Sequence, residues 1–281
     1  MKIRIFSTLL LFTLISGLIG RSVVYANEEN HKIVGYIQGW TMARVPLSEI
    51  RLEQTTHLIY SGVKVASSTD PTIVSSWGWE YIAQCVDAGH AKGIKVFIGL
   101  ESTPKSNYLS DVVHSPSLLN TLVDNIKNML LTYNADGIDI DWETGEPQSD
   151  MNLLLDAIYP VLHPLGKEVS MAASWYRYDI GLTQANNSID LIMVMTYDMW
   201  SPHPLPYNST FEDSVAAMNM WIDGGYPKEK LLMGIPFYGK DNNGTVAIYG
   251  NIVDALNPTS DQNQANITSI LGWGNVTNTV D

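Results

Sequence analysis

The sequence predicts an α/β protein with the (β/α)8 TIM-barrel fold, in which seven strands are clear and the barrel is incomplete at its C-terminal end. Three observations support this fold class. Short apolar runs alternate with longer amphipathic runs along the chain, which is typical of a parallel sheet covered by helices. Seven strands in one series fit a barrel better than an open doubly wound sheet. No Gly-rich phosphate loop follows the first strand, which weakens the dinucleotide-binding alternative.

The seven short apolar runs are the predicted strands. Parallel strands that are buried on both faces are expected to be nearly continuous in apolar residues, and these runs have that character. In chain order they lie at residues 32–40, 56–65, 94–100, 135–143, 169–175, 189–200 and 230–239.

The amphipathic runs between these strands predict helices. The segment 75–93 has helical period and ends at Gly93, a common helix stop. The segment 115–134 begins with Ser115 as the expected cap and Pro116 in the first turn. Further helices are expected at 149–166, 180–187 and 210–225.

The first residues of the chain predict a secretory signal peptide. Lys2 and Arg4 precede an apolar run, and the small residue Ala26 marks the expected cleavage point. The run is short for a membrane-spanning helix. We therefore expect a signal peptide at 1–26, a secreted, extracellular protein, and a catalytic barrel at 27–281 that does not associate with the membrane after cleavage.

Charge and cysteine content narrow the classes of partner. The formal net charge is −13, and it becomes −16 once residues 1–26 are removed, because they carry three basic and no acidic residues. We expect no binding to nucleic acid or anionic membranes, whereas the negative charge does not exclude neutral polymers as partners. The single cysteine, Cys85, cannot form an internal disulfide and is expected to be a buried small hydrophobe. No His or Cys spacing indicates a metal site, so neither a metal nor a cofactor is predicted.

The segment NADGIDIDWETGE, residues 134–146, places Asp139, Asp141 and Glu143 at alternate positions. Alternate side chains of a strand share one face, so the three acids are expected on the same side. An ordinary surface strand would have the same pattern. Inside a barrel, however, like charges 4 Å apart cost about 4 kcal/mol at an effective dielectric constant near 20, so some carboxyls hold protons. Glu143, nearest the rim where barrel enzymes act, is best placed to donate one.

The pattern Asp136-x-x-Asp139-x-Asp141-x-Glu143 resembles the DxxDxDxE signature of glycoside hydrolase family 18, the chitinases and their relatives. Asp136 breaks the alternation and is interpreted as structural, at the base of the strand. Other segments also resemble the family in order, over about residues 32–240: VGYIQGW, THLIYS, VSMAAS, MTYD and MGIPFYG.

The resemblance implies a retaining mechanism in which the substrate's own 2-acetamido oxygen attacks the anomeric carbon and forms an oxazolinium ion. Glu143 would protonate the glycosidic oxygen. Asp141 would orient the acetamido nitrogen, and Asp139 would share a proton with Asp141. Tyr197 would donate a hydrogen bond to the acetamido oxygen, although a core tyrosine with a satisfied hydroxyl is the alternative.

The resemblance also implies a sugar-binding subsite around these acids. Met195 and Asp198 would line it, and Tyr36 would lie beneath it. Aromatic rings at or just beyond the predicted strand ends could stack on sugar rings, with ordinary packing as the alternative for each of them. These rings are Trp40, Trp175, Tyr176, Trp200 and Tyr238.

Two stretches depart from the family pattern. The third strand of the family usually ends in a Ser-x-Gly-Gly-like turn, whereas FIGLEST keeps Gly99 and adds an acid, Glu101, near the mouth. After residue 240 no strong eighth strand and helix follow, and Trp273 lies in a stretch typical of the region before that strand. We therefore expect a barrel truncated before its eighth strand, closed by something else, or a fragment.

Three function classes follow. The first is a secreted, endo-acting and monomeric hydrolase of β-1,4-linked N-acetylglucosamine polymers, most simply a chitinase that binds chitin or N-acetylglucosamine oligosaccharides. An endo-β-N-acetylglucosaminidase and a cell-wall muralytic hydrolase are its near alternatives. The second is a non-catalytic chitin-binding lectin, and the third is an inert fragment. Glu143 favours an enzyme, because members that only bind sugar often lack this acid.

Overall fold

The computed structural model describes most of the chain between residues 32 and 249. The described ranges are 32–102, 107–143, 148–199, 208–240 and 246–249, with the short segments 266–267 and 278–279. The expected signal peptide and the candidate aromatic residues Trp200 and Trp273 lie outside these ranges.

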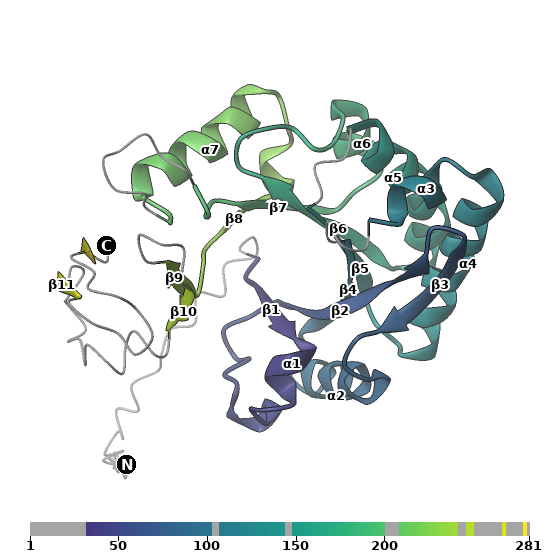
Figure 1. Ribbon diagram of the computed structural model, residues 1–281, viewed down its shortest axis with the longest axis horizontal. Helices are drawn as coiled ribbons and strands as arrows, with labels where there is room; N and C mark the ends of the chain where they lie inside the picture. The colour runs from purple at the N-terminus through teal and green to yellow at the C-terminus, as the bar shows by residue number, and fades with distance from the viewer. Residues whose placement is uncertain are drawn as a thin grey trace, which may run out of the picture. The chain divides into compact units, whose positions relative to one another are not determined.

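A parallel sheet curls into most of a barrel and carries its helices on the outer side (Figure 1). Each strand pairs in parallel with the next one in the series. This is the predicted barrel, with all seven predicted strands present. In order across the sheet they are β1 (Val34–Gln38), β2 (His57–Ser67), β4 (Lys95–Ser102), β5 (Gly137–Trp142), β6 (Glu168–Ser174), β7 (Leu191–Met195) and β8 (Leu231–Gly234).

The barrel is open between its first and last strands. Within the described residues β1 and β8 each pair on one side only, so the expectation of an incomplete barrel is confirmed. Close to this gap in the chain, β10 (Val246–Ile248) pairs antiparallel with β9 (Tyr238–Lys240) and not with the barrel sheet. Two further short strands, β11 (Asn266–Ile267) and β12 (Asn278–Thr279), pair only with each other.

Several strand ends differ from prediction for local reasons. The predicted strand 189–200 stops at Met195, because the chain turns there and Asp198 takes a left-handed backbone with φ 55°. The predicted strand 230–239 stops at Gly234, just before Ile235 and Pro236, and proline lacks the N–H that a ladder needs. β3 (Asp70–Ser75) was not predicted; it folds back antiparallel onto the long β2.

The helices follow the predicted series with small changes. Ser115 is the N-cap residue of the helix 116–132, as predicted, but its hydroxyl contacts Ser117 Oγ at 3.3 Å and makes no capping hydrogen bond. Thr210 does cap a helix, because its Oγ1 accepts from Asp213 N at 3.1 Å. The helices are α1 (Gly39–Met42), α2 (Trp79–His90), α3 (Leu109–Val113), α4 (Pro116–Thr132), α5 (Gln148–Leu162), α6 (Leu182–Asn187) and α7 (Phe211–Asp223), with 3-10 turns at Leu47–Glu49, His163–Leu165 and Lys228–Lys230.

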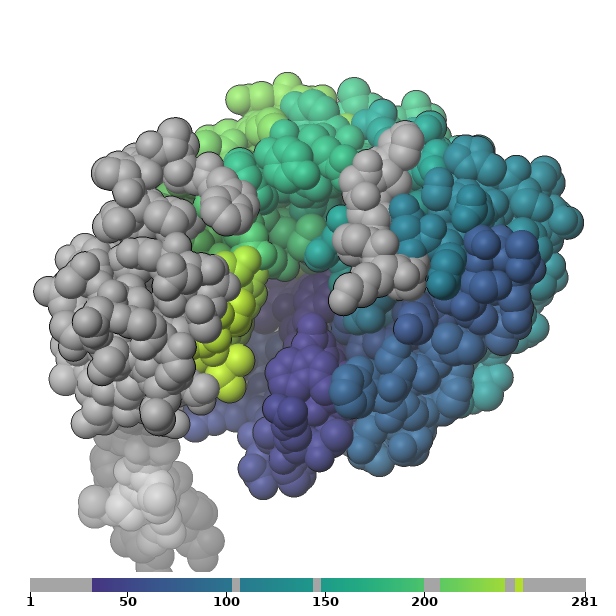
Figure 2. All heavy atoms as spheres, viewed as in Figure 1, coloured from purple at the N-terminus to yellow at the C-terminus, as the bar shows by residue number. Residues whose placement is uncertain are grey.

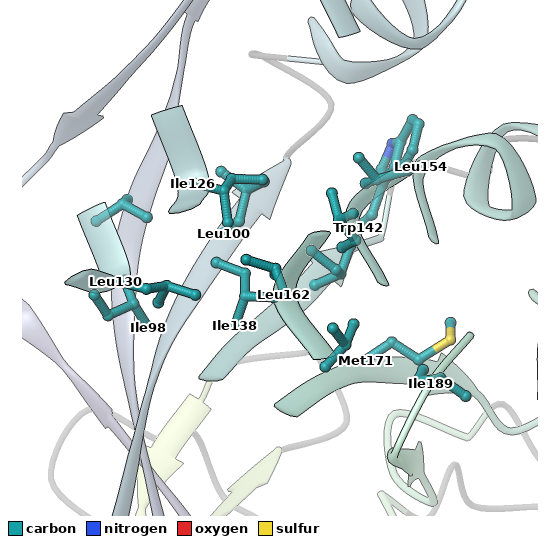
Figure 3. Close-up of a cluster of buried hydrophobic side chains, with 14 of the residues drawn as sticks. Ile98, Leu100, Ile126, Leu130, Ile138, Trp142, Leu154, Leu162, Met171 and Ile189 are labelled. Atoms are coloured by element: carbon teal, nitrogen blue, oxygen red, sulfur yellow. The ribbon is translucent and has the colours of Figure 1, made fainter. Parts of the chain in front are cut away.

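The main core lies between the sheet and its outer helices. Ile98 and Ile138, on β4 and β5, meet Ile126 and Leu130 of α4 there (Figure 3). Cys85 is buried in the same layer, where its thiol donates to Met42 Sδ at 3.2 Å, as a small hydrophobe should. In the described part of the chain, no helix is long and apolar enough to cross a membrane.

The barrel interior is layered, and the layers position the site. Ile59 and Phe97 fill the base with residues of β7. One layer higher, the register aligns Ser61, Gly99 and Asp139 on neighbouring strands, and Ser170 of β6 follows. Above these come Glu101 of β4 and Asp141 of β5, which are partners in the ladder. Polar groups therefore begin two residues above an apolar floor.

An ion-paired carboxylate supports the base of the sheet. Glu168 lies 3.6 Å from His57 Nε2 and pairs with the Lys95 ammonium. These two partners hold the pKa of Glu168 at about 2, against the opposing effect of burial. Because the folded-state pKa is lowered, the pair stabilises the fold above the ordinary glutamate range and this contribution is lost as the pH falls toward 2.

We expect Glu168→Gln to lower the free energy of unfolding at pH 7 by about 1–2 kcal/mol, after allowance for the partial exposure of the site. The loss should shrink steadily between pH 5 and pH 2.5, as measured by thermal unfolding. Glu53→Gln is the matched control, because Glu53 pairs with Lys92 at 2.6 Å on the open surface and should change stability little. A loss of unfolding free energy that is the same at pH 5 and at pH 2.5 would contradict an electrostatic origin.

Candidate active site

The alternating acids of β5 lie on the inner face of the barrel at the carboxyl ends of the strands. Ile138 and Trp142 point to the outer core (Figure 3), and Ile140 belongs to the same core cluster, as the period of two requires. Asp139 has 0% exposed surface, whereas Glu143 follows the end of the strand and is exposed. The carboxyls thus form a column from the barrel interior to its mouth, and the surface-strand alternative does not hold for Asp139.

Two hydroxyls hold the deepest carboxyl. Ser170 Oγ donates to Asp139 Oδ1 at 2.6 Å, and Tyr36 Oη donates to Asp139 Oδ2 at 3.0 Å. Burial raises the pKa of Asp139 to about 6, although both hydrogen bonds act in the opposite direction. At neutral pH the group therefore lies close to its titration point. Tyr36 places its hydroxyl on this carboxyl while 44% of the residue stays exposed.

Ser170 was not among the residues singled out from the sequence. On one side the register places Gly99 of β4 beside Asp139, and a glycine has no hydroxyl to donate. Ser170 of β6 is the ladder partner of Asp139 on the other side. The stretch VSMAAS contains this serine one position inside the strand, but only the pairing of β5 with β6 identifies it as the donor.

The middle carboxyl, Asp141, is enclosed by other acids. It shares a hydrogen bond with Glu143, and its Oδ1 is buried with no hydrogen-bond partner among the described residues. Burial raises its pKa well above the ordinary aspartate value, and the charges of Glu143, Asp139 and Glu101 raise it further. Asp141 is therefore the group in this column that most readily keeps a proton.

A second set of side chains follows β7. Tyr197 lies near the acids, and its pKa is raised by burial and by the charges of Glu143 and Asp141, so its hydroxyl keeps its proton. Asp198 accepts from Tyr238 Oη at 2.8 Å and pairs with Lys240 Nζ at 2.5 Å. The rings of Tyr197 and Tyr238 meet edge to face at 6.0 Å. Tyr238 and Lys240 of β9 thereby hold the carboxylate of Asp198, which the family resemblance assigns to the sugar subsite.

A cavity of about 540 Å³ opens beside Glu143, large enough for a small ligand. In Figure 2 the molecule is hollowed between the green side of the sheet and the purple β1. Four of the predicted sugar-binding residues, Trp175, Tyr176, Met195 and Asp198, line this cavity together with the predicted Tyr197. Its lining is Trp142, Glu143, Ala172, Ser174, Trp175, Tyr176, Arg177, Asp179, Met195, Tyr197 and Asp198.

Residues after β6 form a wall of this cavity, in which the sequence indicated Trp175 and Tyr176 but not Arg177 and Asp179. Arg177 Nε pairs with Asp179 Oδ1 at 2.6 Å, and Asp179 also accepts from the backbone N–H of Ser174. The Trp175 and Tyr176 rings stand edge to face, 5.1 Å apart. The available signal was the dense run of aromatic and charged residues directly after a strand, at the end where barrel enzymes place their sites.

The remaining candidates lie elsewhere. Trp40 belongs to α1, where the Arg44 guanidinium lies 5.6 Å from its ring, and it is not among the cavity-lining residues. Asp136 lies at the base of β5, where its Oδ2 accepts from Val96 N at 2.7 Å and contacts His90 Nε2 at 2.8 Å. Among the described residues, no group of His, Cys, Asp and Glu is arranged to hold a metal ion.

Comparison with known proteins gives consistent results. The model of the family described as glycosyl hydrolases family 18 matches residues 32–279. A chitinase-like effector of Moniliophthora roreri is 26% identical over 239 residues, which cover 73% of this chain and 57% of that protein. The chain thus spans less than two thirds of the length of this curated relative.

Solved structures show the same fold. A chitinase from Bacteroides thetaiotaomicron superposes with a TM-score of 0.74 at 20% identity, covering 84% of this chain and 80% of that chain. A class V chitinase from Nicotiana tobaccum in complex with NAG4 superposes with a TM-score of 0.68 at 19% identity, covering 85% and 82%.

We expect Asp139→Asn to change how stability depends on pH. A carboxyl whose pKa is raised to about 6 binds a proton in the folded state that the unfolded chain releases near its ordinary value of 3.8, so wild-type stability falls as the pH rises through this window. The fall amounts to about 3 kcal/mol. The amide variant should lack it, so its advantage over wild type should grow between pH 4 and pH 7.5.

Chemical denaturation at the two pH values measures this advantage. Ser170→Ala is the companion variant, because it removes a donor that favours the carboxylate and should lose about 1–3 kcal/mol at pH 7.5. An Asp139→Asn advantage that is the same at pH 4 and pH 7.5 would contradict the assigned titration.

Proposed function

We propose, from the premise that this chain belongs to the glycosyl hydrolases of family 18, that it hydrolyses β-1,4-linked N-acetylglucosamine polymers such as chitin, as an endo-acting enzyme. The observation that carries the proposal is the column of Asp139, Asp141 and Glu143, which ends in the wall of a cavity with Tyr197 across from it. Proteins of similar sequence and fold are named chitinases, and one of them was solved with NAG4.

In the proposed reaction Glu143 gives its proton to the glycosidic oxygen as the bond to the anomeric carbon breaks. The acetamido oxygen of the same sugar attacks that carbon from the opposite side and forms the oxazolinium ion. Water then adds to the anomeric carbon, Glu143 takes a proton back, and the configuration is retained. The chain supplies no nucleophile, which agrees with a site whose acids are stacked along one strand.

The neighbouring groups would make the substrate's own amide a better nucleophile. Asp141 accepts a hydrogen bond from the acetamido nitrogen once it turns from Glu143, and it offsets the positive charge that develops there. Tyr197, which keeps its proton, donates to the acetamido oxygen. Asp139 lies one layer deeper with a pKa of about 6, so it can take up the proton that Asp141 releases on turning.

Sugar binding is assigned to the aromatic and polar wall of the cavity. Trp175 and Tyr176 offer apolar ring surface, and Asp198 offers a carboxylate that Tyr238 and Lys240 hold in place. Rings and a charged hydrogen-bond acceptor in the lining of one cavity suit a pyranose, which has apolar faces and hydroxyl edges. We also propose that the protein acts as a monomer and is secreted after removal of residues 1–26, which the mass and N-terminus of the exported protein would test.

Binding without hydrolysis is the second candidate. The specific observation in its favour is a relative that is called a chitinase-like effector rather than a chitinase. The presence of Glu143 at the mouth of the site favours catalysis, since a protein that only binds chitin has no use for this proton donor.

We expect Glu143→Gln to reduce turnover of a chromogenic chitobioside by about 10² to 10⁴-fold, because general acid catalysis has this typical value. Binding of chitin oligomers, measured by calorimetry, should stay close to wild type, since the amide keeps the size of the side chain. Glu229→Gln, in the turn Lys228–Lys230, is the control and should keep full turnover. Retention of more than a tenth of the wild-type rate in Glu143→Gln would refute the assignment.

We expect substrates that lack the N-acetyl group next to the scissile bond to resist cleavage. Without the acetamido oxygen there is no nucleophile, whatever the protein contributes. The measurement compares the release of products from chitin oligomers and cellulose oligomers of equal length. Similar rates on both would show that a protein side chain attacks the sugar and that the substrate-assisted mechanism is wrong for this chain.

A further inference from the structure

A fourth carboxylate, that of Glu101, belongs to the acid column but has no part in the proposed reaction. Glu101 lies on β4, and the parallel register pairs it with Asp141 of β5. Residues paired in this way on adjacent strands project to the same face, and the strands are about 4.8 Å apart. Glu101 therefore faces the barrel interior beside Asp141.

A hydroxyl from a third strand fixes the position of Glu101. Ser61 of β2 is 4% exposed and its Oγ donates to Glu101 Oε1. Ser61 is the ladder partner of Gly99, two residues before Glu101 on the same face. A Cβ at Gly99 would come within 3.3 Å of Ser61 Cα and of the Tyr60 carbonyl oxygen. The glycine thus leaves the strands close together, and the serine reaches past it to the acid.

The surroundings of Asp141 contain several acids and little that offsets them. Within the described residues no ion pair includes Asp141 or Glu101. The titratable groups that face Asp141 come from β1, β4, β5 and the turn after β7, and the carboxyls and hydroxyls among them are Tyr36, Glu101, Asp139, Glu143 and Tyr197. Each carboxylate in this set disfavours a negative charge on Asp141.

We infer that Glu101 is a positioning residue that keeps a proton on Asp141 and so holds Asp141 turned toward Glu143 until substrate arrives. The inference rests on the proposed function for its catalytic consequence. With Glu101 charged, the Asp141–Glu143 pair keeps its shared proton at higher pH, because a second negative charge would have to form beside a fixed one. The pair then stays ready to protonate the glycosidic oxygen over a wider pH range.

The matched variants separate charge from packing. Glu101→Gln removes the charge but keeps an oxygen that can accept from Ser61. Glu101→Asp keeps the charge, and Ser61→Ala keeps it as well while removing the hydrogen bond. If the charge of Glu101 acts, only Glu101→Gln should lower the pH at which activity is lost on the alkaline side.

The experiment is a pH profile of kcat/KM between pH 4 and pH 9 on a chromogenic chitobioside for wild type and the three variants. We expect the alkaline limb of Glu101→Gln to move down by about one pH unit, since removal of a nearby like charge lowers a carboxyl pKa by this order. Glu101→Asp and Ser61→Ala should keep the wild-type limb. An equal loss of rate at every pH in Glu101→Gln, without movement of the limb, would overturn the inference and leave Glu101 a structural residue.

A second readout needs no activity. Relief of the repulsion should stabilise Glu101→Gln over wild type at pH 8, where the Asp141–Glu143 pair is closer to losing its shared proton, and much less at pH 4, where the pair keeps it. A gain in Tm of about 2–4 °C at pH 8 corresponds to about 1 kcal/mol for a chain of this size. If the chain hydrolyses no chitin but shows this pH-dependent gain, the proposed function fails and the interaction of Glu101 with Asp141 stands. A gain that is equal at both pH values overturns the inference.

Discussion

The burial of one carboxyl group, that of Asp139, is the constraint on which the site depends. A carboxylate without exposed surface is strongly disfavoured unless hydrogen bonds offset the loss of water. Tyr36 and Ser170 provide those bonds from β1 and β6, strands on either side of β5 in the sheet but far apart in the chain. The curvature of the sheet is what brings a donor from β1 to a residue on β5. Burial raises the pKa of Asp139 and the two hydrogen bonds lower it, so that the pKa lies at about 6, close to neutral pH.

The rest of the column follows from that buried group. With one acid held deep in the barrel, each further acid on the same strand face meets a like charge, and the pKa of Asp141 rises accordingly. Burial and mutual repulsion therefore keep these carboxyls from all being ionised at the same time. Such an arrangement reduces stability, yet it provides movable protons near the strand ends. Glu168, an ion-paired acid whose pKa is lowered, lies at the opposite end of the strands.

The open side of the barrel has a different character from the site. Where β8 lacks a second neighbour, large apolar side chains reach solvent, with Phe237 74% exposed and Ile235 65% exposed. Unpaired strand edges and apolar surface favour association with other chains or strands. The cavity itself is lined by β5, β6 and β7 and the segments that follow them, so its walls come from the paired part of the sheet.

The sequence by itself determined the elements and the acid column. Apolar periodicity identified all seven strands of the series, because strand and helix periods are local properties. The spacing of two identified Asp139, Asp141 and Glu143 as one face. The strand-end position also identified Trp175, and the family resemblance implied Met195 and Asp198, as residues of the region where the cavity lies.

Only the tertiary structure decided which groups touch these acids. Ser170 and Ser61 are ordinary serines within apolar runs, and they became partners of Asp139 and Glu101 through strand register, over separations of 31 and 40 residues. Trp40 matched the same strand-end pattern as Trp175, yet the chain turns into α1 there and takes it away from the cavity lining. Hydrogen bonds and charge interactions act over a few ångströms in space, whereas the sequence pattern records only neighbours along the chain. Contacts between residues on different strands could therefore be identified only from the tertiary structure.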